Sequence, residues 1–378
     1  MGQRSPDTQG DTQGTGRDPF FDNAKLLAMV LVVAGHAWQP LKDSHAVWSG
    51  YLFLYMFHMP LFIVISGYFS RSFAFKPEQG KRLITGVAVP YLVFEAAYTL
   101  YGNAVDGRHN DLSLLSPWYL TWFLAALFVW RLTAPVWRAM RWYLAVGLAL
   151  AAALIGAATP LSGVLNLARV LQFLPFFVIG LVLRPEHWQL LRARWVRIAS
   201  VPVLVGGAAM AYWVKGRMTA QWAMHNHSWE DLHVSWPVGM AMTLATTACS
   251  LVLAAAFLAW VPRRRTWFTQ LGAGTLCAYL LHGFFVRTAA WKGWFDAPFW
   301  HIPAGELTVT AFGVALALAL TSPPVRRFFR PVMEPRLDWA FRLPGAAPDR
   351  PRSRPAPDHA PEEARVPAAS QGSRTTSG

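Results

Sequence analysis

The chain alternates long apolar runs with short segments that hold most of its charges. A helix that crosses the hydrocarbon core of a bilayer needs about 20 apolar residues. Ten runs bounded by charged residues approach that length, at residues 26–41, 44–70, 83–105, 112–130, 142–168, 170–183, 198–214, 232–262, 266–286 and 307–325. The first is short unless Lys25 extends toward the lipid headgroups, and the sixth is shorter still, so nine helices stay an alternative. The pattern predicts an all-α integral membrane fold with about ten transmembrane helices.

The Lys and Arg residues between these runs favour one orientation, because cytoplasmic loops of membrane proteins carry an excess of positive charge. With a cytoplasmic amino terminus, the cytoplasmic connections hold Arg71, Lys76, Lys81, Arg82, Arg131, Arg138, Arg141, Arg184, Arg192, Arg194, Arg197, Arg263, Arg264, Arg265, Arg326, Arg327 and Arg330. The opposite connections hold Lys42, Arg108, Arg169, Lys215, Arg217, Arg287 and Lys292. The cytoplasmic set is larger by about two to one or better. We therefore expect both termini in the cytoplasm.

The two ends of the chain differ in composition from everything between them. Residues 1–18 are polar and Gly-rich, without the basic and apolar regions of a cleaved signal peptide. The chain from residue 342 onward is rich in Pro, Arg, Ala and Ser. Such compositions are typical of disordered segments. We expect a disordered tail over 1–18, one membrane domain over 19–341 and a second disordered tail over 342–378.

Composition excludes a soluble protein and several kinds of site. Apolar residues make up 54% and charged residues 14% of the chain, against roughly 25% charged residues in soluble domains. The net charge of +14 suggests nucleic-acid binding at first sight, but the chain has no basic soluble module to carry it. The two cysteines, Cys249 and Cys277, both lie in apolar runs, which excludes a disulfide scaffold and a cysteine-based zinc site.

Four ionisable residues lie well inside apolar runs, and burying such groups in a membrane is costly enough to make each a candidate for function: His36, His58, Glu95 and His282. A neutral imidazole can accept a proton from a hydroxyl group. Lys25 and His36 are eleven residues apart, about three helical turns, so they share a face and lie roughly 16 Å apart along the axis. The sequence predicts Lys25 at the cytoplasmic edge and His36 beyond the membrane midplane.

Each of the four also has a structural interpretation. His36 could bond across two helices, and His58 could satisfy the carbonyl that Pro60 frees two residues further on. Glu95 could pair with Arg169, and His282 could simply sit beside Gly283 where two helices pack. A histidine in three different helices at similar depth nevertheless favours a shared chemical role.

The long connection over residues 215–236 is rich in aromatic and ionisable residues. His225, His227 and His233 accompany Glu230 and Asp231, but their spacing fits no standard metal-ligand pattern. We expect a wet, aromatic, substrate-facing loop and no metal site. Basic residues on the cytoplasmic side either signal topology alone or contact a polyanionic ligand such as a nucleotide-bearing cofactor. The basic residues to which both interpretations apply are Arg71, Lys81, Arg82, Arg138 and Arg184.

Six segments, in this order, carry a resemblance to a known family: FFDNAKLLAMVLVVAGHAW, FHMPLFIVISGYFSR, KRLITGVAVPYLVF, PWYLTWFLAALF, FLPFFVIGLVLR and AYLLHGFF. Each motif alone is loose, whereas the ordered set is specific. Over about residues 19–330 the chain resembles the acyltransferase type 3 family of membrane proteins. It is most similar to the branch of fucose 4-O-acetylase and related acetyltransferases.

The resemblance implies ten transmembrane helices in the plasma membrane and transfer of an acyl group, commonly acetyl, from cytoplasmic acyl-CoA. The implied acceptor is a hydroxyl of a glycan, a lipid-linked sugar, an antibiotic or another small molecule. The family pattern of a basic residue, ten residues and an essential histidine maps onto Lys25 and His36. The family more often has Arg at the first position, and Lys keeps the charge but loses the bidentate fork. An RxxR motif, common in the family after the second helix, is absent here, where Arg71 stands alone.

Together these observations predict an O-acyltransferase in which His36 is the general base, assisted by Lys25 and Glu95. His58, Tyr119, Trp122 and His282 would form the substrate site, and Arg71, Lys81, Arg82 and Arg184 would hold the acyl-CoA. Direct transfer and a route through an acylated side chain both stay open. A proton-coupled transporter or flippase and a non-catalytic scaffold are the alternatives, although the chain shows no internal repeat. If the protein is an enzyme, we expect a channel from the cytoplasmic face to His36 with Arg or Lys at its mouth.

Overall fold

The computed structural model of the protein describes residues 18–107, 109, 111–161 and 164–341. All regular elements within these residues are helical, which confirms the predicted all-α fold class. The α-helices are α1 (Pro19–Ala37), α2 (His45–Phe69), α3 (Pro77–Leu83), α4 (Val89–Asp106), α5 (Trp122–Ala139), α6 (Trp142–Ala158), α7 (Leu167–Val182), α8 (Pro185–Leu190), α9 (Arg194–Trp213), α10 (Gln221–Met224), α11 (Trp236–Leu258), α12 (Thr275–Trp291), α13 (Pro303–Leu320) and α14 (Pro323–Met333). A π-helical turn, η2 (Ile84–Ala88), joins α3 to α4, and short 3-10 turns are η1 (Gln39–Leu41), η3 (Val164–Asn166), η4 (Thr269–Gly274), η5 (Pro298–His301) and η6 (Asp338–Ala340).

Each of the ten predicted apolar runs overlaps one of these helices. In the described part of the chain, seven helices are both long and apolar enough to cross a membrane: Pro19–Ala37, His45–Phe69, Pro77–Asp106, Val164–Val182, Arg194–Trp213, Trp236–Leu258 and Pro303–Leu320. The chain is therefore a multi-pass membrane protein. The count of ten spans and the cytoplasmic termini stay predictions.

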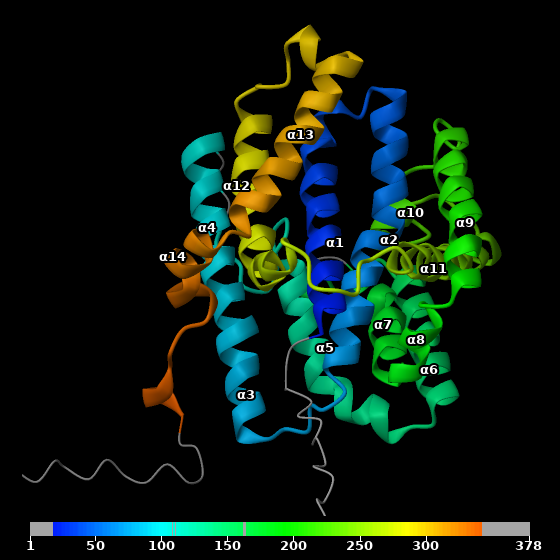
Figure 1. The fold of residues 1–378 in the computed structure, drawn as a ribbon, viewed down its shortest axis with the longest axis vertical. Helices are drawn as coiled ribbons and strands as arrows, with labels where there is room; N and C mark the ends of the chain where they lie inside the picture. Colours follow the sequence, from blue (N-terminus) through cyan, green and yellow to red (C-terminus); the bar gives the residue numbers. More distant parts are fainter. Residues whose placement is uncertain (1–17, 108, 110, 162–163, 342–378) are drawn as a thin grey trace, which may run out of the picture. The chain divides into compact units, whose positions relative to one another are not determined.

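Helix α1 lies in the middle of the bundle, in contact with α2, α12 and α13 (Figure 1). Helices α2 and α7 pack with their backbones almost touching. A Cβ atom on Gly67 would collide with the carbonyl oxygen of Phe177, and one on Gly180 would collide with that of Val64. The hydrophobic effect contributes little to helix association in lipid. Small residues at such crossings let the two backbones approach closely, and the resulting van der Waals contacts stabilise the helix pair.

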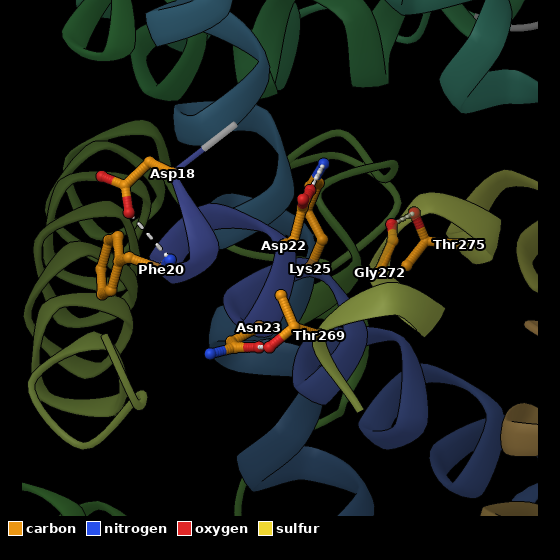
Figure 2. Close-up of polar contacts among 8 residues, drawn as sticks. All are labelled: Asp18, Phe20, Asp22, Asn23, Lys25, Thr269, Gly272 and Thr275. Atoms are coloured by element: carbon orange, nitrogen blue, oxygen red, sulfur yellow. Dashed lines mark hydrogen bonds and ion pairs between the residues drawn. The ribbon is translucent and has the colours of Figure 1, made fainter. Parts of the chain in front are cut away.

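The start of α1 is fixed by polar side chains, as Figure 2 shows. Asp18 caps the helix by accepting a hydrogen bond from the backbone N–H of Phe20 at 2.9 Å, and Pro19 occupies the first helical position. The fully buried Asn23 accepts a hydrogen bond from the Thr269 hydroxyl at 2.8 Å and donates to the carbonyl of Pro262 at 2.8 Å. These bonds tie α1 to the segment that leads into α12.

The fourth predicted run is wrong at both ends. It covers 112–130, whereas α5 begins at Trp122 and continues past Arg131 to Ala139. Pro117 disfavours helical backbone before it, and Tyr119 has a left-handed φ of 51°. Irregular backbone at membrane depth needs partners within the protein. Here Leu115 accepts a backbone hydrogen bond from Leu165.

The run over 142–168 is likewise two elements. Helix α6 ends at Ala158, and α7 starts at Leu167. The predicted tails, apart from Asp18, and the predicted loop charge Arg108 lie outside the described residues.

Candidate active site

A cavity of about 140 Å³ lies where α1, α2, α5, α7, α10 and α12 come together. Histidine, aromatic and amide side chains and one arginine account for most of its wall. The lining residues are His36, Gln39, Tyr51, Tyr55, His58, Met59, Tyr119, Leu120, Trp122, Arg169, Phe173, Ala223, Met224 and Tyr279. The cavity therefore brings together four residues that the sequence predicted for the site, from three different helices and the loop before α5.

His36, in the wall of this cavity, is paired with a second histidine behind it. Nδ1 of His36, near the end of α1, lies 3.3 Å from Nε2 of His282 in the middle of α12. The two residues are 246 positions apart in the sequence. His282 is fully buried and lies outside the cavity lining, so it contacts His36 rather than the cavity.

Backbone carbonyls fix the tautomer of all three membrane histidines. Nδ1 of His36 lies 2.9 Å from the Val32 oxygen. Nδ1 of His58 lies 2.7 Å from the Leu54 oxygen, and Nδ1 of His282 lies 2.8 Å from that of Ala278. A carbonyl oxygen can only accept, so in the neutral ring Nδ1 carries the proton and Nε2 keeps its lone pair.

This assignment makes His36 the donor of the contact with His282. Its Nδ1–H is shared between the carbonyl of Val32 and the Nε2 lone pair of His282. Nε2 of His36 is then free to accept a proton from a molecule in the cavity, while the opposite side of the ring is held by two acceptors. His58 does not bond the carbonyl that Pro60 frees; its ring binds Leu54 instead.

Aromatic rings enclose His36 on the cavity side. The ring of Tyr119 is 5.6 Å from that of His36, and the ring of Tyr55 is 5.9 Å away. Tyr55 also contacts His58 at 4.7 Å and accepts a hydrogen bond from Gln39 at 3.2 Å. Such a wall, apolar with a few placed polar groups, is typical of a site for a small organic ligand.

Glu95 lies outside this wall but holds part of it in place. Its carboxylate, 1% exposed, accepts hydrogen bonds from the backbone N–H of Trp118, at 3.1 and 3.0 Å, and from the Thr121 hydroxyl at 2.5 Å. The segment between these two partners supplies Tyr119 to the cavity. The structural alternative of a Glu95–Arg169 pair is thus replaced by bonds to this segment. Arg169 lies instead over the ring of Trp122, at 4.9 Å.

A second, larger cavity of about 800 Å³ opens at the other end of α1. It is lined by Asp18, Phe21, Asp22, Lys25, Ile65, Ser66, Tyr68, Phe69, Arg71, Ser72 and Arg131. Lys25 forms an ion pair with Asp22 at 2.8 Å (Figure 2), so its charge is compensated and it lies far from His36. Arg71 stacks on Tyr68, with 3.6 Å between the guanidinium carbon and the ring centre, and donates to the carbonyl of Leu183 at 3.1 Å.

Of the remaining predicted cofactor residues, Arg82 lines an adjoining cavity that shares Arg131 with the larger one. Lys81 instead forms an ion pair with Asp338, and this hydrogen bond lowers the pKa of the Asp338 carboxyl. Arg184 is exposed at the start of α8. Of the four, the structure thus brings Arg71 and Arg82 to neighbouring cavities.

Sequence reasoning missed Arg131 and Arg169 as cavity residues, having placed both in loops. Arg131 lies inside α5, and Arg169 is the third residue of α7. Each of the two arginines lies between two apolar stretches. That pattern fits a charged residue within one longer helix as well as it fits a charged loop. Tyr55, one turn before His58, carried no signal of its own.

The loop over 215–236 contributes Ala223 and Met224 to the wall of the His36 cavity. His225 is buried against Phe173, with 4.7 Å between the rings. In the described residues, no group of three or more His, Cys, Asp or Glu side chains is arranged to hold a metal ion.

Fold and site together define a polytopic helical membrane protein with a buried imidazole pair at one cavity and arginines at another. The comparisons with known proteins specify this class. A family model described as an acyltransferase domain matches residues 18–323. The chain belongs to that family, acyltransferase type 3, and is a membrane O-acyltransferase that transfers groups other than aminoacyl groups.

Two relatives carry the same name. Nodulation protein NolL of Mesorhizobium japonicum is 25% identical over 365 residues, covering 89% of this chain and 92% of the relative. Nodulation protein NolL of Sinorhizobium fredii is 29% identical over 183 residues, covering 43% and 48% respectively. No solved structure matches the chain. Family membership decides for an enzyme among the classes that the sequence left open.

Proposed function

We propose that this protein transfers an acyl group, in the first place acetyl, from acyl-CoA to a hydroxyl of a sugar, glycan or other small acceptor, with His36 as general base. One observation carries the proposal. The hydrogen bonds of His36 Nδ1 to Val32 and His282 leave Nε2 as the basic nitrogen at the cavity. The family supplies the reaction class, and this geometry supplies the base.

The reaction needs no covalent enzyme intermediate. His36 Nε2 takes the proton of the acceptor hydroxyl as its oxygen attacks the thioester carbonyl. The tetrahedral intermediate then collapses, the carbon–sulfur bond breaks, and the thiolate leaves with the proton that His36 returns. The products are the acyl ester and free CoA. A positioned general base contributes about 10²- to 10⁴-fold to the rate.

His282 acts through His36 as a positioning residue. When His36 is protonated at Nε2, its Nδ1–H still donates to the Nε2 lone pair of His282 and to the Val32 carbonyl. Both acceptors then stabilise the imidazolium charge and hold the ring orientation, the part that a carboxylate plays in other catalytic groups of this kind.

The cavity with Lys25, Arg71 and Arg131 is the proposed acyl-CoA site, on the cytoplasmic side. Arginine recognises phosphate oxygens through two parallel hydrogen bonds. The two cavities are separate, but α1 and α2 line both: in α2, Met59 faces one and Ile65 the other. Six residues of helix span roughly 9 Å. A donor anchored by its phosphates at one cavity would extend its acyl end along these helices toward His36. We place the enzyme in the plasma membrane with both termini in the cytoplasm.

The test uses membranes that carry the wild type, His36→Ala or His301→Ala at matched expression. His301 lies exposed in η5 and serves as the control histidine. Each sample receives labelled acetyl-CoA and a host extract of glycans and metabolites. We expect label transfer by the wild type and the control, and a loss of about 10²-fold or more in His36→Ala. Equal transfer by all three would remove His36 from the mechanism.

A further inference from the structure

The His36 cavity contains a cation without a matching anion. Its lining includes Arg169 but, within the described residues, neither Asp nor Glu. Nε of Arg169 is buried and has no hydrogen-bond partner. A buried guanidinium normally has its donors satisfied and its charge paired, because each is costly to leave uncompensated away from water.

The surroundings of Arg169 compensate little of this cost. Its guanidinium carbon lies 4.9 Å over the Trp122 ring, and a cation–π contact offsets only part of the desolvation of a buried ion. Arg169 is also the third residue of α7, whose first turn has no side-chain cap. A helix amino terminus carries partial positive charge, which disfavours a cation there and favours an anion. Burial and helix dipole therefore both favour an anionic ligand group beside Arg169.

We propose that the acceptor of this enzyme is anionic, with a carboxylate or phosphate that Arg169 binds while His36 deprotonates a nearby hydroxyl. The inference rests on the proposed function and specifies its acceptor. Both Arg169 and His36 line the same small cavity, so the charged group and the acylated hydroxyl belong to the same sugar-sized molecule. The aromatic side chains of the cavity wall, Tyr55 and Tyr119 among them, provide apolar surface for a sugar ring. A uronic acid and a sugar phosphate share this chemistry.

The test compares matched acceptor pairs with the full chain purified in lipid nanodiscs. Each pair contrasts a neutral sugar with an anionic counterpart: methyl glucoside against methyl glucuronide, in which a carboxylate replaces the 6-hydroxymethyl group, and glucose against glucose 1-phosphate, in which a phosphate is added at C1, with the galactose and mannose counterparts. Labelled acetyl-CoA is the donor. Transfer gives kcat and KM, and quenching of tryptophan fluorescence without donor gives binding directly. Melting temperatures check the folding of every variant.

The variants are chosen to separate charge from fold. Arg169→Gln removes the charge, and Arg169→Lys keeps it without the planar fork. Arg197→Gln is the matched control, since the Arg197 guanidinium lies 5.5 Å from the Trp260 ring, as that of Arg169 lies over Trp122, yet Arg197 does not line the cavity.

We expect the wild type to favour the anionic member of at least one pair by about 10-fold or more in kcat/KM. Arg169→Gln should abolish that preference, mainly through KM, Arg169→Lys should keep part of it, and Arg197→Gln should retain it. The pair that shows the preference distinguishes carboxylate from phosphate. Equal use of neutral and anionic sugars, or no binding of either, would overturn the proposal.

Two further outcomes separate this inference from the function on which it rests. A loss of kcat in Arg169→Gln that is equal for both members of a pair would place Arg169 at the reacting carbonyl and reject the anion site. Binding of the anionic sugar that depends on Arg169, without any transfer of label, would support the anion site and reject acyl transfer.

Discussion

The bonds of Glu95 give the most specific prediction about the cavity wall. The carboxylate holds the Trp118 N–H and the Thr121 hydroxyl, at either end of a turn in which Tyr119 adopts a left-handed φ of 51°. That conformation costs about 1–2 kcal/mol for a residue with a Cβ. The bonds from Glu95 offset this cost, since a hydrogen bond to a charged group contributes about 1.5–3 kcal/mol. Without them, the strained turn loses its hydrogen bonds to the Glu95 side chain of α4.

Two substitutions of Glu95 weaken these hydrogen bonds to different extents. Glu95→Gln keeps an acceptor oxygen for the Trp118 N–H, and its NH2 group can donate to the Thr121 hydroxyl, so the bonds to a charged group become neutral ones at a cost of about 1–3 kcal/mol. Glu95→Ala loses both and leaves the buried Trp118 N–H without this partner, for a total of about 2–5 kcal/mol. Once the native turn is no longer the favoured conformation, every further 1.4 kcal/mol of destabilisation lowers the fraction of molecules that hold it about tenfold. We expect a loss of roughly 10-fold in kcat/KM for Gln and 10²-fold or more for Ala.

The assay is acetyl transfer by the purified variants, with melting temperatures measured alongside. Glu306→Gln, in the first turn of α13 and outside the cavity lining, is the control and should behave as the wild type. If Gln and Ala were equally inactive at unchanged melting temperature, Glu95 would act in proton transfer and the positioning role would be refuted. Wild-type activity in Glu95→Ala would refute both roles.

Substitutions at His282, Gly67 and Arg131 test three other contacts of the structure. His282→Asn should lower kcat about 10- to 100-fold with little change in KM, because His36 loses its second acceptor; an unchanged kcat would detach His282 from the mechanism. Gly67→Ala should lower the free energy of unfolding by about 1–3 kcal/mol, since the new Cβ meets the carbonyl of Phe177, and an unaltered melting curve would contradict the close α2–α7 contact. Arg131→Gln should raise KM for acetyl-CoA and not for the acceptor, as steady-state kinetics can check; the reverse pattern would remove Arg131 from the donor site.

The helical pattern was predictable because hydrophobicity along a membrane helix is a local property of the chain. Each predicted run overlaps a helix, but the boundaries of α5 were not predictable in the same way. Residues 112–121 carry no charge and belong to the predicted run over 112–130, yet they form an irregular segment whose backbone makes hydrogen bonds with Glu95 and Leu165. Conversely, Arg131 lies inside α5 and does not end it, and its charged side chain lines the larger cavity.

The sequence by itself determined the all-helical membrane fold, the acyltransferase family and the candidate histidines, since these depend on composition, run length and ordered motifs. It also placed Lys25 and His36 on one helix, but not the ion pair of Lys25 with Asp22. Only the tertiary structure decided that His282 lies behind His36, that Glu95 holds the Tyr119 turn and that Arg169 lines the cavity. The partner of a buried side chain depends on how helices far apart in the sequence pack, and the local sequence of one helix does not identify the helix beside it.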